Sequence, residues 1–231
     1  MNDWPETLRF LRTVRSLSAL SDEELEGLRP CLRQRTVEKG EHVYCQGQGT
    51  EYLYFIRQGR VKVSQTAVNG KEVIVGYHGP RELLGCCGLV GDVCYPCYAE
   101  AVEPTDVVYV TREIFNRLLS RVPTVASELL TQMVGRLREA HCKMRQLALQ
   151  PVEERVIAVL IELGQEFGSS EDGQVTLPAH VTRQQISEMA GTTIETTSRV
   201  ISNLRRTGLV RSSKRQAILF PDLLEHAIRE T

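Results

Sequence analysis

The chain has 231 residues, 42% of them hydrophobic and 25% charged, enough to bury a real core in one or two domains. The first residues lack the apolar core of a signal peptide, and no stretch reaches the roughly 18 apolar residues that span a bilayer. The seven cysteines do not form the spaced framework of a small secreted domain. We therefore expect a cytoplasmic protein with free thiols and no membrane partner.

The first half of the chain predicts a short helical segment followed by a β-roll. Residues 5–30 read as helical, and Ser21 with Glu24 forms a capping box at one helix start. From residue 33 to 112 the pattern changes to short runs of alternating apolar and polar residues, separated by turns that contain glycine. Several strands at roughly ten-residue intervals are typical of a sandwich or roll.

A long helix with a regular apolar seam follows. Its apolar residues recur with alternating spacings of four and three: Ala126, Leu130, Met133, Leu137, Ala140, Met144 and Leu147. A strict 3.5-residue repeat over three heptads is the narrow seam of a coiled coil, whereas a helix packed only within its own chain usually shows a broader stripe. The seam, above all Leu130, Met133, Leu137 and Met144, predicts a parallel homodimer. A helix packed within its own chain is the alternative.

The last third of the chain predicts a helix-turn-helix with a wing. Pro151 begins a new helix that ends near Gly168, and a polar loop follows at 169–174. We then expect a helix over 182–189, a tight turn through Ala190 and Gly191, and a second helix over about 193–206. Two short strands around a basic turn complete the segment. The domain boundary is expected near 148–151.

The charge of this last segment points to DNA. The net charge of the whole chain is −1, yet residues 181–220 hold seven arginines or lysines against two glutamates. The second helix begins with short polar side chains and can place its N-terminal end in a major groove, while Ile194, Val200, Ile201 and Leu204 can face the core. Glu195 could accept from cytosine and Arg199 could bond guanine. The expected phosphate contacts are Arg183, Gln184, Arg205, Lys214 and Arg215.

This order of helix, roll, long helix and winged helix-turn-helix resembles the CRP/FNR family of transcription regulators over nearly the whole chain. The stretch "TRQQI" from Thr182 is similar to the phosphate-contacting start of the family's motif, and "TIETTSR" from Thr193 to the E-x-x-S-R signature of the FNR branch. The resemblance implies an α+β fold, with a cyclic-nucleotide-binding-like β-roll over 1–120, a dimerisation helix over 121–150 and a winged helix-turn-helix domain over 151–231. It also implies a transcription regulator that binds palindromic DNA with TTGAT half-sites and contacts RNA polymerase. We expect this regulator to be an activator. Its base-reading residues would be Thr193, Glu195, Ser198 and Arg199.

The same resemblance bears on the effector. The segment "ELLGCCGLV" from Glu82 is similar to the phosphate-binding cassette of the family, but Cys86 stands at the position of the ribose-binding glutamate. Pro96 and Cys97 stand at the phosphate-binding arginine and serine. A cyclic phosphate would lose its charge partner there, which costs several kcal/mol, so cyclic nucleotide binding is not expected.

The cassette is instead rich in sulfur. Cys86, Cys87, Cys94 and Cys97 could hold an iron–sulfur cluster or a soft metal, or form a reversible disulfide, and thereby sense redox state, oxygen or nitric oxide. Residues 1–30 contain no cysteine, so the N-terminal cluster ligands of the FNR branch have no counterpart. Tyr77 and His78 are candidate haem or polar contacts. The alternatives are a small organic effector with structural cysteines and, more distantly, a thiol-redox enzyme, although no catalytic constellation supports an enzyme.

Overall fold

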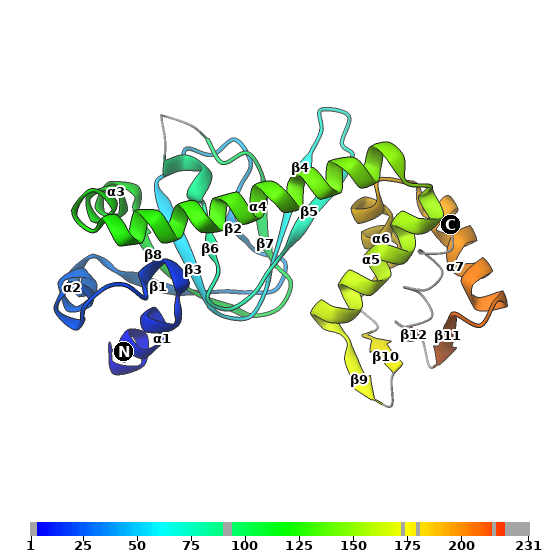
Figure 1. Ribbon diagram of the computed structural model, residues 1–231, viewed down its shortest axis with the longest axis horizontal. Coiled ribbons are helices and arrows are strands. Elements are labelled where there is room, and N and C mark those ends of the chain that lie inside the picture. The colour runs from blue at the N-terminus through cyan, green and yellow to red at the C-terminus, as the bar shows by residue number, and fades with distance from the viewer. Residues whose placement is uncertain (1–3, 90–93, 172–173, 179–180, 214–215, 220–231) are drawn as a thin grey trace. The chain divides into compact units, whose positions relative to one another are not determined.

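The computed structural model describes the chain except for residues 1–3, 90–93, 172–173, 179–180, 214–215 and 220–231 (Figure 1). The chain divides into two compact units, Met1–Arg138 and Glu139–Thr231. Helix α4 (Pro123–Leu149) contributes residues to both units. The limits of 1–120, 121–150 and 151–231 expected from the sequence therefore stay predictions, and each unit is described by itself.

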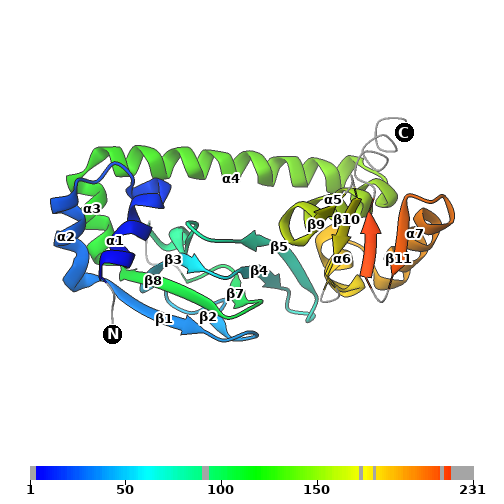
Figure 2. The same cartoon turned by 90° about the horizontal axis from the view of Figure 1, so that it is seen from below.

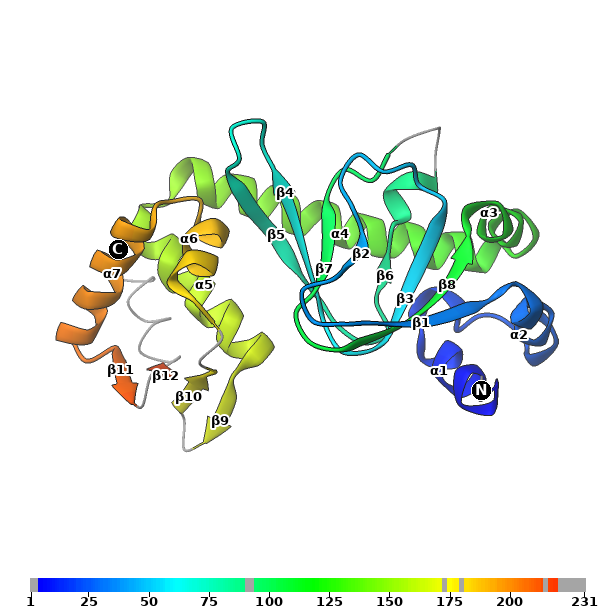
Figure 3. The ribbon, with the colours of Figure 1, turned by 180° about the vertical axis from the view of Figure 1, so that it is seen from behind.

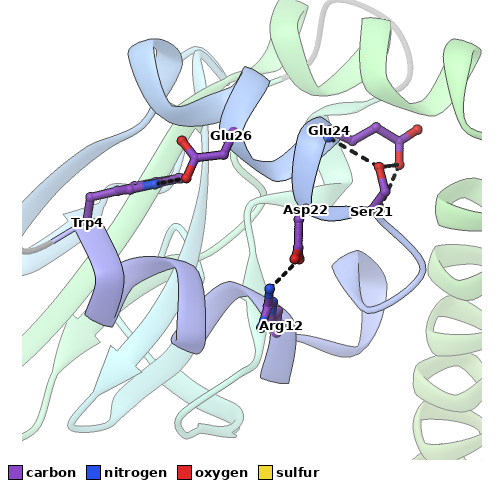
Figure 4. A network of polar contacts seen from close by, with 6 residues as sticks. All are labelled: Trp4, Arg12, Ser21, Asp22, Glu24 and Glu26. Atoms are coloured by element: carbon purple, nitrogen blue, oxygen red, sulfur yellow. Dashed lines mark hydrogen bonds and ion pairs between the residues drawn. The ribbon is translucent and has the colours of Figure 1, made fainter.

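Two short helices open the first unit rather than one helical run. They are α1 (Trp4–Thr13) and α2 (Asp22–Leu28), each followed by a 3-10 turn, Arg15–Leu17 and Arg29–Cys31. The capping box of Ser21 and Glu24 is confirmed at the start of α2. Figure 4 shows how the helices are joined: Trp4 Nε1 donates to Glu26 at 2.6 Å, and Arg12 pairs with Asp22.

The β-roll consists of two antiparallel sheets, as expected (Figure 2). The first sheet has the order β1–β8–β3–β6, and the second has the order β2–β7–β4–β5. The strands are β1 (Arg33–Val37), β2 (His42–Tyr44), β3 (Tyr52–Gln58), β4 (Val61–Thr66), β5 (Glu72–His78), β6 (Leu83–Leu84), β7 (Tyr98–Ala101) and β8 (Thr105–Thr111). A 3-10 turn, Cys86–Leu89, leaves β6 and carries two of the cassette cysteines.

Strand β3 of the first sheet is buried on both faces. Alternate residues of β3 point to opposite sides of the sheet, so Leu53 and Phe55 face a core shared with α1, α2, α3 (Arg112–Arg121) and the start of α4. Tyr54 and Ile56 face a second core between the two sheets. This explains why the β3 sequence is a continuous apolar run rather than a polar–apolar alternation. It also places the cassette turn between the roll and α4.

The apolar residues of α4 lie on two adjacent faces of the helix. Val125 and Leu129 are buried in the first core, and Met133 packs against that core at the same side of the helix. Met133 is half-buried, and its spacing of i+4 from Leu129 continues the roll-facing side, so its place in the dimer seam stays a prediction. Six large apolar side chains of α4 stay exposed: Leu130, Val134, Leu137, Met144, Leu147 and Leu149. The first four follow one another at spacings of four, three and seven residues and form a separate stripe.

The second unit contains the expected helix-turn-helix (Figure 3). Its helices are α5 (Val152–Phe167), α6 (Arg183–Ala190) and α7 (Ile194–Arg206). Four strands form its sheet in the order β11–β12–β10–β9, namely β9 (Ser169–Glu171), β10 (Gln174–Leu177), β11 (Val210–Ser213) and β12 (Gln216–Leu219). The loop expected over 169–174 is thus wrong in part. Its residues pair across β9 and β10, a tertiary pairing that the polar sequence does not signal.

Candidate DNA interface and thiol site

Two threonines and one glycine set the geometry of the helix-turn-helix. Thr182 caps α6 in a capping box with Gln185, and Thr193 caps α7 by accepting from the backbone N–H of Thr196 at 3.2 Å. Between them Gly191 takes a left-handed conformation with φ of 61°, which ends α6 and turns the chain. The two threonines expected to touch DNA therefore also hold the helix starts in place.

The N-terminal half of α7 presents a polar face. Glu195 and Arg199 are exposed, and Ser198 is half-buried and accepts a hydrogen bond from Arg183 at 3.3 Å. The α7 backbone lowers the pKa of Glu195, with the Thr193 hydroxyl adding to the effect, so this carboxyl is an ionised acceptor at neutral pH. The expected core residues Val200, Ile201 and Leu204 are buried.

Ile194 differs from the expectation that it faces the core. It is 42% exposed, and Thr197 is fully buried in α7 instead. Ile194 is the first residue of the helix, where the side chain lies over the turn and not over the packed face. An exposed apolar side chain therefore lies at the start of the α7 polar face.

The cationic residues expected at phosphates lie at the start of α6 and the end of α7. Arg183, Gln184 and Arg205 are exposed, whereas Lys214 and Arg215 lie outside the described residues. Sequence reasoning missed Ser202 and Arg206, which are exposed and continue the face of Glu195 and Arg199 at helical spacing. They line a shallow groove of about 620 Å³ together with Glu153 and Asn203. Counting i, i+4, i+7 and i+11 from Glu195 would have found them.

The four cassette cysteines do not come together. Cys94 is exposed at an isolated bridge to Gly49, and Cys97 is buried with its sulfur 3.9 Å from the hydroxyl of Tyr44. Among the described residues, which include all four cysteines, no three His, Cys, Asp or Glu side chains are placed to hold a metal ion. The residues as arranged do not fit an iron–sulfur cluster, which needs several thiolates on one site. His78, the candidate haem contact, pairs with Glu82 at 3.0 Å, and Tyr77 is half-buried.

Cys86 and Cys87 form a thiol pair beside an arginine. The Arg136 guanidinium on α4 donates to Cys86 Sγ at 3.3 Å and to the Leu83 carbonyl at 2.7 Å. The pKa of the exposed Cys87 thiol is lowered to about 6 by its interaction with the adjacent Cys86 thiol and by the positive charge of Arg136. The interaction with Cys87, together with burial, raises the pKa of Cys86. Of the two thiols, the exposed Cys87 is the one favoured as a thiolate.

Alkylation of Cys87 by iodoacetamide should show this activation directly. Because its pKa is near 6, the rate should rise through pH 6 and be nearly constant above about pH 7, whereas a free cysteine peptide continues to accelerate up to about pH 8.5 or higher. Peptide mass spectrometry of samples quenched at each pH measures the rate at Cys87. A rate at Cys87 that follows the free peptide would show that the pair does not activate it.

Tyrosine side chains fill the roll interior next to the pair. Tyr44 and Tyr95 stack with ring centroids 4.0 Å apart, and Tyr54 lies against Tyr44 at 5.9 Å. The Tyr95 hydroxyl donates to the Tyr52 carbonyl at 2.6 Å, which fixes the ring. The alternating strand pattern did not reveal this cluster, because its members come from three separate segments.

Comparison with known proteins identifies the two units. Residues 34–122 match the cyclic nucleotide-binding domain, and residues 154–227 match the Crp-like helix-turn-helix domain. The chain is 30% identical over 192 residues to the cyclic AMP receptor protein of Thermus thermophilus, covering 83% of this chain and 86% of that protein. The chain belongs to the CRP/FNR family of transcription regulators. This confirms the family expected from the sequence, including its fold.

Other CRP/FNR regulators are comparably similar. The transcriptional activator protein Anr of Pseudomonas protegens is 26% identical over 199 residues, covering 86% of this chain and 81% of that protein. The solved structure of FixK2 from Bradyrhizobium japonicum has a TM-score of 0.70 and 27% identity, and the match covers 84% of this chain and 96% of that one. The matched relatives are transcription regulators, so this chain is a DNA-binding regulator of the CRP/FNR type. Within the described residues, no helix is long and apolar enough to cross a membrane.

Proposed function

We propose that this CRP/FNR regulator binds palindromic operators of the FNR type as a homodimer, and that oxidation of the Cys86–Cys87 pair changes its operator affinity. The observation that carries the sensing half is the activated thiol pair, with one sulfur exposed and the other bonded to Arg136 of α4. For the DNA half, the support is the polar α7 face of Glu195, Ser198 and Arg199 in the E-x-x-S-R order.

Peroxide is the simplest oxidant for this pair. The Cys87 thiolate attacks one peroxide oxygen, the O–O bond breaks as the S–O bond forms, and the released hydroxide takes up a proton to become water. Sulfur is oxidised by two electrons to a sulfenic acid, and the peroxide is reduced. Burial raises the pKa of the Cys97 thiol, which makes Cys97 a poor nucleophile and leaves it a packing residue between the sheets.

A cyclic nucleotide is a poorer candidate for the effector. The cassette has Cys86, Pro96 and Cys97 where the family resemblance places the ribose and phosphate contacts, and the neighbouring roll interior holds Tyr44 and Tyr95. Relatives of this chain include a protein named for cyclic AMP, so the point needs its own measurement. Addition of cyclic AMP should leave operator affinity unchanged. A change in operator affinity would show that the β-roll binds a cyclic nucleotide as its effector.

The sensing role is tested by serine substitution. Peroxide treatment of the wild-type protein should change operator affinity about 5- to 150-fold, the range of ordinary allosteric coupling. Cys86→Ser/Cys87→Ser should lose this response, whereas Cys142→Ser, which removes an exposed thiol of α4, should keep it. Fluorescence anisotropy with a labelled palindrome gives each affinity. An equal response in the double variant would show that the pair has only a structural role. The alternative, a small organic effector bound in the β-roll, would then be favoured.

A further inference from the structure

Arg136 is the residue through which the thiol pair contacts α4. It lies three residues beyond Met133 and seven beyond Leu129, so it continues the side of the helix that packs on the roll. Its two terminal nitrogens donate hydrogen bonds to the same part of the roll, one to the Cys86 sulfur and one to the Leu83 carbonyl. Leu137, the next residue along the helix, belongs to the exposed apolar stripe.

The two contacts of Arg136 differ in how they respond to chemistry. The Leu83 carbonyl is a constant acceptor, but the sulfur is not: a neutral thiol accepts weakly, and an ionised or oxygenated sulfur accepts much more strongly. A covalent adduct on the pair removes the acceptor or displaces the side chain. The contact that holds this stretch of α4 to the cassette turn is therefore strengthened or weakened by the state of two adjacent sulfurs.

The geometry points to Arg136 as the positioning residue that couples chemical change at Cys86 and Cys87 to helix α4 and to the apolar stripe beside it. This inference rests on the proposed function, because it specifies how that thiol site is read. A ligand that changes only the strength of this one contact can shift α4 between two positions without any rearrangement of the roll core. Arginine suits the role because its planar guanidinium presents separate N–H donors in a fixed fork, which can meet the sulfur and the carbonyl with different nitrogens.

Helix α4 offers a matched control for the test. Arg138 is an exposed arginine two residues further along, so Arg138→Gln removes the same charge from the same helix. Arg136→Gln removes the charged fork, and Arg136→Lys keeps the charge but replaces the planar fork with a single ammonium group. Full-length proteins are labelled with N-ethylmaleimide, whose double bond adds the thiol S–H without a leaving group. The Cys86→Ser/Cys87→Ser variant identifies effects of labelling at other thiols.

The first measurement is hydrogen–deuterium exchange of α4 peptides that cover residues 130–140, before and after labelling. In the wild type and in Arg138→Gln, labelling should raise the exchange rate of these amides at least threefold. In Arg136→Gln the exchange rate should already be raised, and labelling should change it less than about 1.5-fold. Should Arg136→Gln unfold, Arg136→Lys takes its place, with a labelling effect under half of the wild-type value. A full wild-type response in either Arg136 variant would overturn the inference.

The second measurement separates this inference from the proposed function. Operator affinity is determined on the same labelled samples. If wild-type α4 exchange responds to labelling through Arg136 while operator affinity stays constant, the contact is real and the proposed sensing role is wrong. If operator affinity responds but does so equally in Arg136→Gln, the sensing role holds and the signal passes by another route, which contradicts the assignment of Arg136.

Discussion

Leu137→Glu should convert the dimer to monomers and lower operator affinity by about two orders of magnitude or more. Leu137 is 54% exposed in the single chain and lies in the stripe of Leu130, Val134 and Met144, so its burial requires a second copy. In a dimer the substitution would bury two facing carboxylates without partners, which costs several kcal/mol. A monomer would also lose the effective concentration that links two half-sites, a factor of about 10² to 10⁴.

The control for this prediction is Cys142→Glu. Cys142 is exposed on α4 and lies outside the apolar stripe, because the stripe continues from Leu137 through position 141 and the next residue points about 100° away. The same charge at Cys142 should therefore leave the dimer intact. Sedimentation velocity gives the oligomeric state, and anisotropy gives the affinity. Dimers of Leu137→Glu with normal operator binding would show that the chain associates through another surface.

Arg199→Ala should cost about 1–3 kcal/mol of binding on the specific operator and relax the preference at one base pair. The reason is that Arg199 is exposed on the α7 face and can form two hydrogen bonds with a guanine edge. Arg205→Ala removes an equal charge from the last turn of α7, where a phosphate contact is expected, so it should weaken all sequences alike. Binding to the operator, to single-base variants and to random DNA distinguishes the two. Equal losses on specific and random DNA for Arg199→Ala would exclude it from base reading.

Local sequence signals predicted most of the fold because they depend on neighbouring residues. The capping box at Ser21, the αL turn at Gly191 and the glycine-separated strands all follow from short-range geometry. Long-range contacts could not be predicted, because they depend on residues that are not neighbours in the sequence. Ser169 pairs with Thr176 in a sheet, although the polar residues around it predict a loop. Whether Met133 faces the roll or a partner depended on packing that a seven-residue repeat does not specify.

The candidate site was predicted in its parts but not in its arrangement. The cysteine-rich cassette was visible in the sequence, and so was its position relative to the family pattern. Its division into an adjacent pair, an exposed Cys94 and a buried Cys97 was not, because strand β7 and the tyrosine cluster draw Cys97 inward. Arg136 was not predicted either, since fifty residues separate it from Cys86.

The proposed sensing role depends most on the connection between an oxidised Cys87 sulfur and operator affinity. The most direct test treats the full-length protein with a graded series of peroxide concentrations and measures, on each sample, the oxidised fraction of Cys87 by mass spectrometry and the operator affinity by anisotropy. Operator affinity should change in proportion to that fraction, and the change should reach about 5- to 150-fold at complete oxidation. Unchanged operator affinity in a sample whose Cys87 is fully oxidised would contradict the proposed sensing role.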